Sequence, residues 1–289
     1  MLKRQAVLLR FLERAGRPVS HFEMVKWSFI LKTESSSMGG DSFFDFLPYK
    51  KGPFSFCLYQ EAGKLEENGY MMSPDDSHWR ITEKGAAVSR SLESNISRDV
   101  DRVIQRFEQK AYDDLVQYVY SRNPWFTVNS TIRKEEMRPI CEVKVFTAGY
   151  ESLSIDSFLN GLMRKGIQRV IDVRSNPIAR RYGFHKSTLS RLCGYLDIDY
   201  VHIPELGIPS SMRQTLETLS DYEKLFAEYD ASILPYQEDA VARVCEMMQG
   251  KPSVLICMEA DPRYCHRTRI AKAVSAKISL SISDIGAVP

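Results

Sequence analysis

The sequence predicts an α/β protein in which a parallel-sheet, Rossmann-like domain follows a winged-helix-like α+β domain and a helical linker. Three observations predict this. Short apolar runs alternate with helical patterns after residue 142. Polar clusters follow nearly every one of those runs. The first third of the chain instead places helical patterns before a hairpin signal. The expected domains are residues 1–90, a connector over 91–141, and residues 142–289.

Composition bounds the class of protein. Hydrophobic residues make up 44% of the 289 and charged residues 26%, which is ordinary for a globular chain. Because 39 basic residues face 37 acidic ones, any nucleic-acid-binding surface must be local. The apolar runs are far shorter than the roughly 20 residues of a membrane span. Six cysteines without a CxxC pair or a preceding signal peptide argue against a zinc module and a secreted disulfide scaffold, so we expect a cytoplasmic protein with reduced thiols.

The N-terminal part carries helical patterns over residues 1–14 and after Ser20, and a third over residues 55–68. Two strand-like pieces at 70–72 and 78–85 flank Pro74 and predict a hairpin wing. Residues 48–55, 65–70 and 81–85 resemble antitoxin-associated Panacea-type domains and winged-helix regulators. This resemblance implies a module that binds DNA or a partner protein. Its candidate phosphate contacts are Lys50, Lys51, Arg80 and Lys84. Ordinary solvated surface is an equally good explanation for these four side chains.

Residues 91–121 show a charged and apolar pattern that predicts a long or broken helix bridging the two halves. Residues 123–139 lack a sustained period, so the domain boundary is expected there.

The C-terminal half predicts strands at 143–148, 170–174, 200–203 and 253–257, with a further strand near 278–284. The first helix is expected to follow Ser154 and to end near residue 164. Further helices are expected over 187–196, over 239–249 and from 265 onward. Residues 204–238 are expected to form an insertion rich in polar residues. In a parallel sheet, the polar clusters at 147–152, 172–181, 204–209 and 259–267 all lie on the carboxyl edge. We therefore expect one composite site there.

Four motifs in this half, at 146–150, 171–177, 200–207 and 257–267, resemble the family called domain of unknown function 488. The resemblance covers roughly residue 143 to the C-terminus. It implies an α/β fold and frequent occurrence beside nucleic-acid or bacterial defence genes, without a settled chemistry. The Gly-His-Ser that usually opens the first motif is Gly149-Tyr150-Glu151 here, so roles given to that histidine and serine do not transfer.

Catalytic candidates at this edge include two carboxylates. Asp172 and Glu259 stand at strand ends, where a carboxylate can act as acid or base or stabilise an oxocarbenium-like centre. Alternatively, Asp172 accepts hydrogen bonds from Arg174 or from loop amides, and Glu259 pairs with Arg267. Cys265, at a helix start, is a candidate nucleophile, and His266 a proton shuttle, although packing and hydrogen-bonding roles explain both.

Substrate-binding candidates combine cations, aromatic rings and small polar groups. They are Tyr150, Arg174, Ser175, Asn176, Tyr200, Gly207 and Arg267. Arginines at strand or helix ends suit phosphate oxygens, and tyrosines suit stacked bases.

Two tempting motifs fail on their own chemistry. Cys257 and Arg263 have Cys-x5-Arg spacing, but acidic residues and Pro262 between them argue against a cysteine phosphatase. The run from Cys257 to His266 lacks a standard zinc spacing, so neither a metal nor a cofactor is expected.

Taken together, these features predict an enzyme directed at a nucleotide or nucleic acid, cleaving a glycosidic or phosphoester bond, with possible substrates including modified DNA in a bacterial defence setting. The alternative is a non-catalytic sensor or transcriptional regulator that binds a nucleotide or modified base. In either case the N-terminal module is expected to bind DNA or a partner protein.

Overall fold

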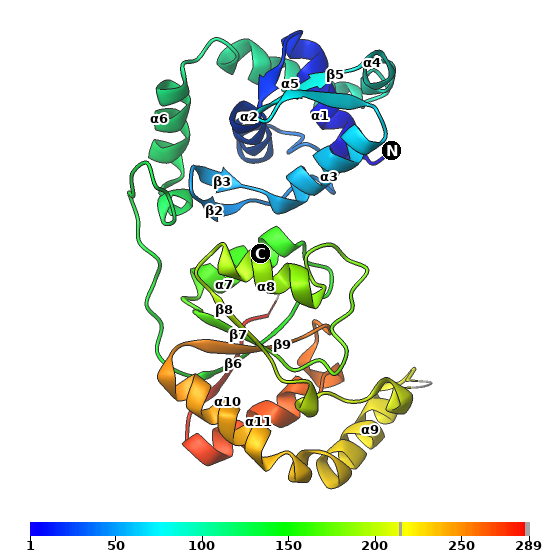
Figure 1. Ribbon diagram of the computed structural model, residues 1–289, viewed down its shortest axis with the longest axis vertical. Coiled ribbons are helices and arrows are strands. Elements are labelled where there is room, and N and C mark those ends of the chain that lie inside the picture. Colours follow the sequence, from blue (N-terminus) through cyan, green and yellow to red (C-terminus); the bar gives the residue numbers. More distant parts are fainter. Residues whose placement is uncertain (214–215, 287–289) are drawn as a thin grey trace. The chain divides into compact units, whose positions relative to one another are not determined.

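A computed structural model describes residues 1–213 and 216–286 and divides the chain into two compact units (Figure 1). Unit 1 is Met1–Met137 and unit 2 is Arg138–Pro289. The division falls within the boundary segment expected from the sequence, close to residue 142. Each unit is described by itself below.

Unit 1 follows the predicted order of helices and hairpin closely. Its helices are α1 (Lys3–Ala15), α2 (His21–Glu34), α3 (Phe56–Glu67), α4 (Glu83–Ser89), α5 (Ser94–Phe107), α6 (Tyr112–Arg122) and the 3-10 turn η1 (Pro124–Thr127). Its strands are β1 (Val19–Ser20), β2 (Leu47–Tyr49), β3 (Gly52–Phe54), β4 (Met71–Asp75) and β5 (His78–Ile81). Ser20 and Ser55 cap α2 and α3 through their side chains, which explains where these two helices begin.

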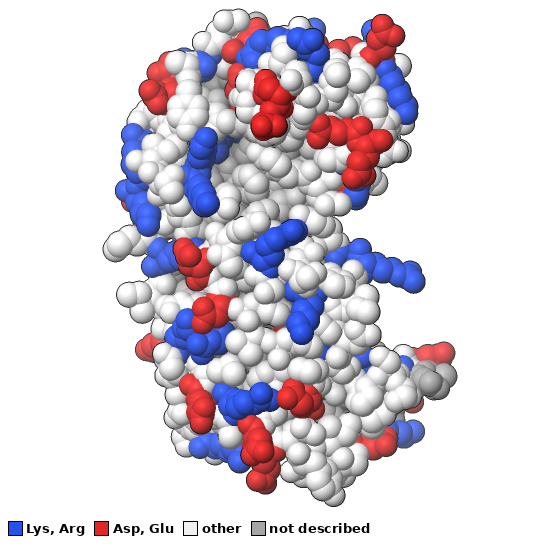
Figure 2. Space-filling model, viewed as in Figure 1, with Lys and Arg blue, Asp and Glu red and all other residues white. Residues whose placement is uncertain are grey.

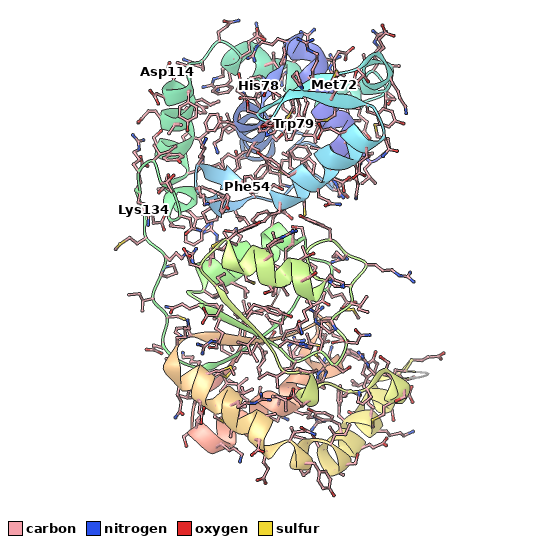
Figure 3. The ribbon with its side chains drawn as sticks, in the orientation of Figure 1. Phe54, Met72, His78, Trp79, Asp114 and Lys134 are labelled. Atoms are coloured by element: carbon pink, nitrogen blue, oxygen red, sulfur yellow. The ribbon has the colours of Figure 1, made fainter. Side chains whose placement is uncertain are left out.

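The two small sheets of unit 1 are antiparallel. One has the order β1-β5-β4 and the other pairs β2 with β3. Trp79 of β5, labelled in Figure 3, is 3% exposed and joins a core to which α1, α2, α3, α5 and α6 all contribute. The predicted hairpin is therefore present, whereas its assignment as the wing of a winged helix stays a prediction.

The helices of the predicted connector belong to this same core. Val100 and Ile104 of α5 and Val116 and Val119 of α6 are buried against α1 and α2 residues. Their apolar stripes are covered within unit 1, so residues 94–122 form part of a domain and do not bridge two. The pattern that predicted a long or broken helix is resolved as two helices.

A buried lysine anchors the turn between β2 and β3. Lys26 of α2 is 2% exposed, and its Nζ donates hydrogen bonds to the carbonyl oxygens of Lys51 (2.6 Å) and Pro53 (2.9 Å). Burial lowers the pKa of Lys26 to about 7, and the neighbouring charge of Lys51 acts in the same direction. The side chains of Lys50 and Lys51 lie exposed on the turn that Lys26 holds.

Unit 2 is an α/β sandwich of the predicted kind. Its strands are β6 (Val145–Gly149), β7 (Arg169–Asp172), β8 (Asp199–His202), β9 (Ser253–Cys257) and β10 (Ile282–Asp284). Its α-helices are α7 (Ile155–Arg164), α8 (Lys186–Gly194), α9 (Leu219–Ser232), α10 (Glu238–Gly250) and α11 (Arg267–Ile278). Short 3-10 turns are η2 (Pro204–Leu206), η3 (Ser210–Met212), η4 (Leu234–Tyr236) and η5 (Pro262–Tyr264).

The five strands form one parallel sheet in the order β10-β6-β9-β7-β8. Helices α7 and α8 cover one face, and α10 and α11 cover the other (Figure 1). Every residue of β6 and β9 is buried, as their continuous apolar runs predicted. This confirms the α/β class and fixes the carboxyl edge on which the polar clusters lie.

Helix α9 was not predicted, because its segment was taken as a polar insertion. The Thr218 hydroxyl oxygen accepts a hydrogen bond from the Asp221 backbone N–H, and the Asp221 carboxylate accepts one from the Thr218 backbone N–H, which closes a capping box. Tyr222, Leu225 and Phe226 then point toward the body of the unit from one helix face.

The distribution of surface charge and the lengths of the helices both agree with what the composition predicted. Basic and acidic side chains are interspersed over the face that Figure 2 shows, without a broad region of one sign. None of the helices within the described residues has the length and apolar character needed to cross a bilayer.

Candidate functional site

The carboxyl edge of the sheet carries two separate polar clusters. The Asp172 cluster comprises Asp172, Arg174, Tyr150 and Tyr200. The Glu259 cluster comprises Cys257, Glu259, Cys265 and His266. Parallel strands β6, β7, β8 and β9 deliver both groups, as the predicted topology requires.

In the Asp172 cluster, a buried ion pair takes up most of the polar groups. Asp172 is fully buried and accepts hydrogen bonds from Arg174 Nε (2.8 Å), Arg174 Nη2 (2.6 Å) and the Arg174 backbone N–H (3.1 Å). The Tyr200 hydroxyl donates a fourth, at 2.6 Å. Arg174 also donates to the Tyr150 hydroxyl (2.6 Å) and to the Phe184 carbonyl oxygen (3.0 Å).

Both charge interactions and ring packing stabilise the Asp172 cluster. Burial acts to lower the pKa of Arg174, but hydrogen bonds and charge from Asp172 outweigh it and raise that pKa. The Tyr150 ring stacks on Phe184 at 4.1 Å between centroids. The alternative in which Asp172 accepts hydrogen bonds from Arg174 is therefore the one observed. The polar groups of Asp172, Arg174, Tyr150 and Tyr200 are already partnered inside the fold. The catalytic role predicted for Asp172 and the substrate-binding roles predicted for the other three stay predictions, and the proposal below does not use them.

Other predicted substrate contacts serve the loops of this edge. Ser175 donates from Oγ to the Ile208 carbonyl oxygen at 2.8 Å. A Cβ on Gly207 would overlap the backbone nitrogen of Ser175, so this position needs glycine for the close approach of two loops. Asn176 lies exposed beside them. Of these three, Asn176 alone presents its side chain freely to solvent.

Arg267, predicted to bind substrate, is instead fully buried behind the loop that follows β9. Its guanidinium donates to the carbonyl oxygens of Glu259 (2.5 Å) and Ala260 (3.1 Å) and pairs with Asp284 of β10 at 3.3 Å. It contacts the backbone of Glu259 and not its carboxylate, which corrects the predicted Glu259–Arg267 ion pair. Arg267 therefore positions the loop that carries Glu259.

The first motif of the domain holds the same loop from its other side. Backbone N–H groups of Tyr150 and Glu151 donate to the Met258 carbonyl oxygen at 3.1 and 2.8 Å. The Glu151 carboxylate accepts a hydrogen bond from the Ala260 backbone N–H at 3.1 Å. Gly149 has no room for a Cβ against the Glu259 carbonyl group. Together these contacts fix the direction in which the Glu259 side chain points.

The Glu259 cluster joins the end of β9 to the start of α11. The Cys257 thiol donates to Glu259 Oε2 at 3.0 Å and lies 3.8 Å from His266 Nδ1. The other ring nitrogen, His266 Nε2, lies 3.1 Å from the carbonyl oxygen of Val173. Since a carbonyl oxygen only accepts, Nε2 carries the hydrogen, and Nδ1 faces the thiols.

Burial and hydrogen bonds set the charges of this cluster. Burial acts to raise the pKa of Glu259, but hydrogen bonds from the Cys257 and Cys265 thiols and the nearby His266 hold it below its usual value. Burial also raises the pKa of Cys265 well above that of an ordinary thiol. Burial acts to lower the pKa of His266, but the hydrogen bond and charge of Cys265 outweigh it, so that this pKa is raised overall. The carboxylate form of Glu259 is thus favoured.

A pocket of about 390 Å³ opens beside Glu259 and His266. Its walls come from the η3 region, α9 and the loop after β9. They are formed by Ile208, Ser210, Arg213, Leu216, Tyr222, Leu225, Phe226, Met258, Glu259, Tyr264 and His266. Among these residues Glu259 is the sole carboxylate. The Tyr222 and Tyr264 rings meet edge to face at 5.1 Å, and burial, followed by the charge of Glu259, raises the pKa of Tyr222.

Among these wall residues, sequence reasoning singled out only Glu259 and His266 as site candidates. Arg213 and Tyr222 fall in the segment taken as an insertion, and Tyr264 was passed over between stronger candidates. A usable signal was present for α9, because Thr218-x-x-Asp221 precedes apolar residues at helical spacing. The pocket itself depends on how α9 packs, which that signal does not give.

A possible metal-ligand set also emerges from the fold. Cys257, Cys265 and His266 each offer one ligand atom, and these atoms lie within 4.8 Å of one another. The sequence spacing gave no reason to expect a metal. The turn η5 nevertheless brings Cys265 and His266 back to the end of β9.

In the N-terminal unit, the predicted DNA contacts are all exposed, but they differ in how free they are. Lys50, Lys51 and Arg80 are exposed on the β2–β3 turn and on β5, and Lys50 Nζ lies 5.7 Å from the Tyr49 ring centroid. Lys84 Nζ instead donates to the Asn68 carbonyl oxygen at 2.8 Å and lies 4.4 Å from the Tyr70 ring centroid. The first three are the better candidates for contacts outside the chain.

Comparison with known proteins identifies the C-terminal unit alone. No curated protein and no solved structure matches the chain. Residues 154–274 match a family model, and this stretch contains α7 through most of α11 and the pocket described above. The family is described as domain of unknown function DUF488, so the resemblance predicted for the C-terminal half is confirmed.

Proposed function

We propose that the C-terminal unit is an enzyme that hydrolyses a bond of a nucleotide or nucleic acid in the pocket beside Glu259. The observation that carries the proposal is the placement of the Glu259 side chain. It is the one carboxylate among the described pocket-lining residues, and it accepts hydrogen bonds from the buried thiols of Cys257 and Cys265. The defence setting implied by the family resemblance stays a prediction.

The walls suit recognition of a base with a phosphate nearby. Tyr222, Tyr264 and Phe226 offer aromatic surface of the kind on which bases stack. Arg213, exposed at the pocket, supplies a forked donor for phosphate oxygens. A volume of about 390 Å³ falls within the range typical of small-molecule sites.

Glu259 favours a glycosidic over a phosphoester bond. A carboxylate beside the reacting centre repels a phosphoryl group but stabilises the positive charge that develops at an anomeric carbon. It also accepts a proton from an attacking water. Because Asp172 is buried in its pair with Arg174, the reaction uses a single carboxylate.

The test is turnover by the full chain on a panel of nucleosides, nucleotides, single-stranded and duplex DNA, and modified DNA. Free bases and phosphoester products are separated by chromatography. We expect Glu259→Gln to lower kcat/KM by about 10²- to 10⁴-fold. Glu246→Gln, which neutralises an exposed carboxylate on α10, is the matched control and should leave the rate unchanged.

The outcomes separate the proposal from its rival. Turnover that is insensitive to Glu259→Gln contradicts the assignment of the reacting group. A ligand that raises the melting temperature without forming product contradicts catalysis and supports a non-catalytic sensor or regulator.

For the N-terminal unit we propose a contact with DNA through Lys50, Lys51 and Arg80. All three side chains are exposed, and buried Lys26 fixes the turn that carries two of them. The double variant Lys50→Gln/Lys51→Gln should weaken binding to a labelled duplex and reduce the slope of log affinity against log salt by about 2. Lys110→Gln, an exposed lysine after α5, serves as control. Weak binding with no salt dependence contradicts this role and points to a partner protein.

A further inference from the structure

Three buried side chains beside the pocket have the chemistry of a transition-metal site. Cys257, Cys265 and His266 are at most 6% exposed, and their ligand atoms lie within 4.8 Å of one another. In a tetrahedral site with bonds of about 2.0–2.3 Å, neighbouring ligand atoms are roughly 3.5–3.8 Å apart. The Cys257 Sγ and His266 Nδ1 atoms are 3.8 Å apart, so small side-chain adjustments complete the set.

The histidine is oriented as a ligand requires. His266 Nε2 donates to the Val173 carbonyl oxygen at 3.1 Å, which leaves the lone pair of Nδ1 directed at the thiols. Metal-binding histidines are commonly fixed through the second ring nitrogen in this way.

Rigid elements hold the three positions. Cys257 ends the fully buried strand β9, and His266 precedes α11. Between them, Asp261 caps the turn η5 by accepting a hydrogen bond from the Arg263 backbone N–H at 2.8 Å. The turn brings Cys265 back toward Cys257 across eight positions of sequence, which is why spacing alone gave no zinc pattern.

We propose that Cys257, Cys265 and His266 bind one divalent ion of the zinc class, with its fourth position open to the pocket beside Glu259. Two thiolates and a neutral imidazole balance the charge of such an ion, and binding releases the two thiol protons. Three protein ligands with one open position are typical of catalytic zinc sites. Glu259 and His266 both line the pocket, which gives substrate and water access to that position.

The role of the ion in catalysis rests on the proposed function. A bound water in the fourth position would lose its proton near neutral pH and pass it to Glu259. The water oxygen then bonds to the electrophilic carbon of the substrate, the bond to the leaving group breaks with its electron pair, and Glu259 delivers the proton to that group. The balance is that of hydrolysis, with no oxidant or reductant.

The experiment measures binding without substrate. The full chain is treated with chelator under reducing, anaerobic conditions and titrated with Co²⁺ while the absorption spectrum is recorded. We expect one Co²⁺ per chain, with thiolate-to-cobalt charge-transfer bands and the ligand-field bands of tetrahedral geometry, all abolished by added Zn²⁺. Cys257→Ser and Cys265→Ser should each weaken binding by more than about 100-fold. Cys245→Ser, a buried cysteine on α10, should not.

The absence of charge-transfer bands in the wild-type chain overturns the proposal, as do bands that persist undiminished in both serine variants. If a serine variant fails to fold, the melting temperature decides for the remaining chains: Zn²⁺ should raise that of the wild type and of Cys245→Ser, and no rise contradicts the site. A chain that binds the ion but turns over nothing refutes the proposed function and leaves the site standing. Full turnover after complete metal removal leaves the enzyme standing and refutes the role of the ion.

Discussion

The two polar clusters on the carboxyl edge of one sheet have opposite characters. In the Asp172 cluster a fully buried carboxylate accepts four hydrogen bonds, three of them from Arg174. In the Glu259 cluster a partly exposed carboxylate accepts hydrogen bonds from two thiols and faces a pocket. The difference separates a carboxylate that stabilises the fold from one that is available for chemistry, although both stand at strand ends.

Breaking the buried pair should give the largest effect on stability. Arg174→Met leaves the Asp172 charge buried without its partner, so we expect a loss of about 3–5 kcal/mol in the free energy of unfolding. The matched control is Arg263→Met, since Asp261-x-Arg263 repeats the spacing of Asp172-x-Arg174 on the surface, where Arg263 is 70% exposed. That change should leave the free energy of unfolding close to that of the wild type, because an exposed pair is screened by water.

Denaturant unfolding followed by far-UV circular dichroism reports both units. The three tryptophans, Trp27, Trp79 and Trp125, all lie in unit 1, so tryptophan fluorescence separates its transition from that of unit 2. Equal losses in the two arginine variants would remove the distinction between the buried and exposed pairs.

A single hydroxyl should give a smaller effect in the same cluster. Tyr200→Phe removes the 2.6 Å hydrogen bond to Asp172, and we expect a loss of about 1.5–3 kcal/mol because the acceptor is charged. Tyr236→Phe, at an 80% exposed position, should change stability by less than about 0.5 kcal/mol. If Tyr200→Phe lowers the free energy of unfolding no more than Tyr236→Phe does, the hydrogen bond from Tyr200 does not stabilise the Asp172 carboxylate.

Lys26 offers a third case beside the two carboxylates, because this buried amine has only backbone carbonyl oxygens, and no carboxylate, as hydrogen-bond partners among the described residues. Its pKa is about 7 in the folded unit and about 10.5 when unfolded, so the unfolded chain binds more protons between these values. Stability of unit 1 should therefore rise with pH in that window, by up to about 1.4 kcal/mol per pH unit. Tryptophan-monitored unfolding from pH 6 to 10 measures this slope, which Lys26→Met should abolish. A wild-type slope that the variant retains would assign it to other groups.

The parallel sheet was predictable because buried parallel strands need continuous apolar runs. Residues 253–257 illustrate this, since the expected strand and β9 coincide. The capped helices after Ser20 and Ser55 were predictable for a similar local reason. Helices α5 and α6 were expected to link the two domains, but they pack in the core of unit 1. An apolar stripe shows that one face of a helix is buried, but it does not show which element buries that face.

The edge as a candidate site was predictable, but the division between its clusters was not. Asp172 and Glu259 look alike in sequence, each a carboxylate directly after or near the end of an apolar run. Their roles differ because Tyr200 and Phe184, distant in sequence, close over Asp172 and Arg174. The pocket beside Glu259 likewise requires α9, and the thiol pair requires the turn η5.

The most direct test of this division compares the unfolding free energies of Asp172→Asn and Glu259→Gln in the same chain. We predict a loss of about 3 kcal/mol or more for Asp172→Asn, because Arg174 is left as a buried unpaired charge. Glu259→Gln should change stability by less than about 1 kcal/mol or increase it, as is common where a polar group serves function more than folding. Equal losses, or a larger loss for Glu259→Gln, would contradict the assignment of Asp172 to the fold and Glu259 to the site.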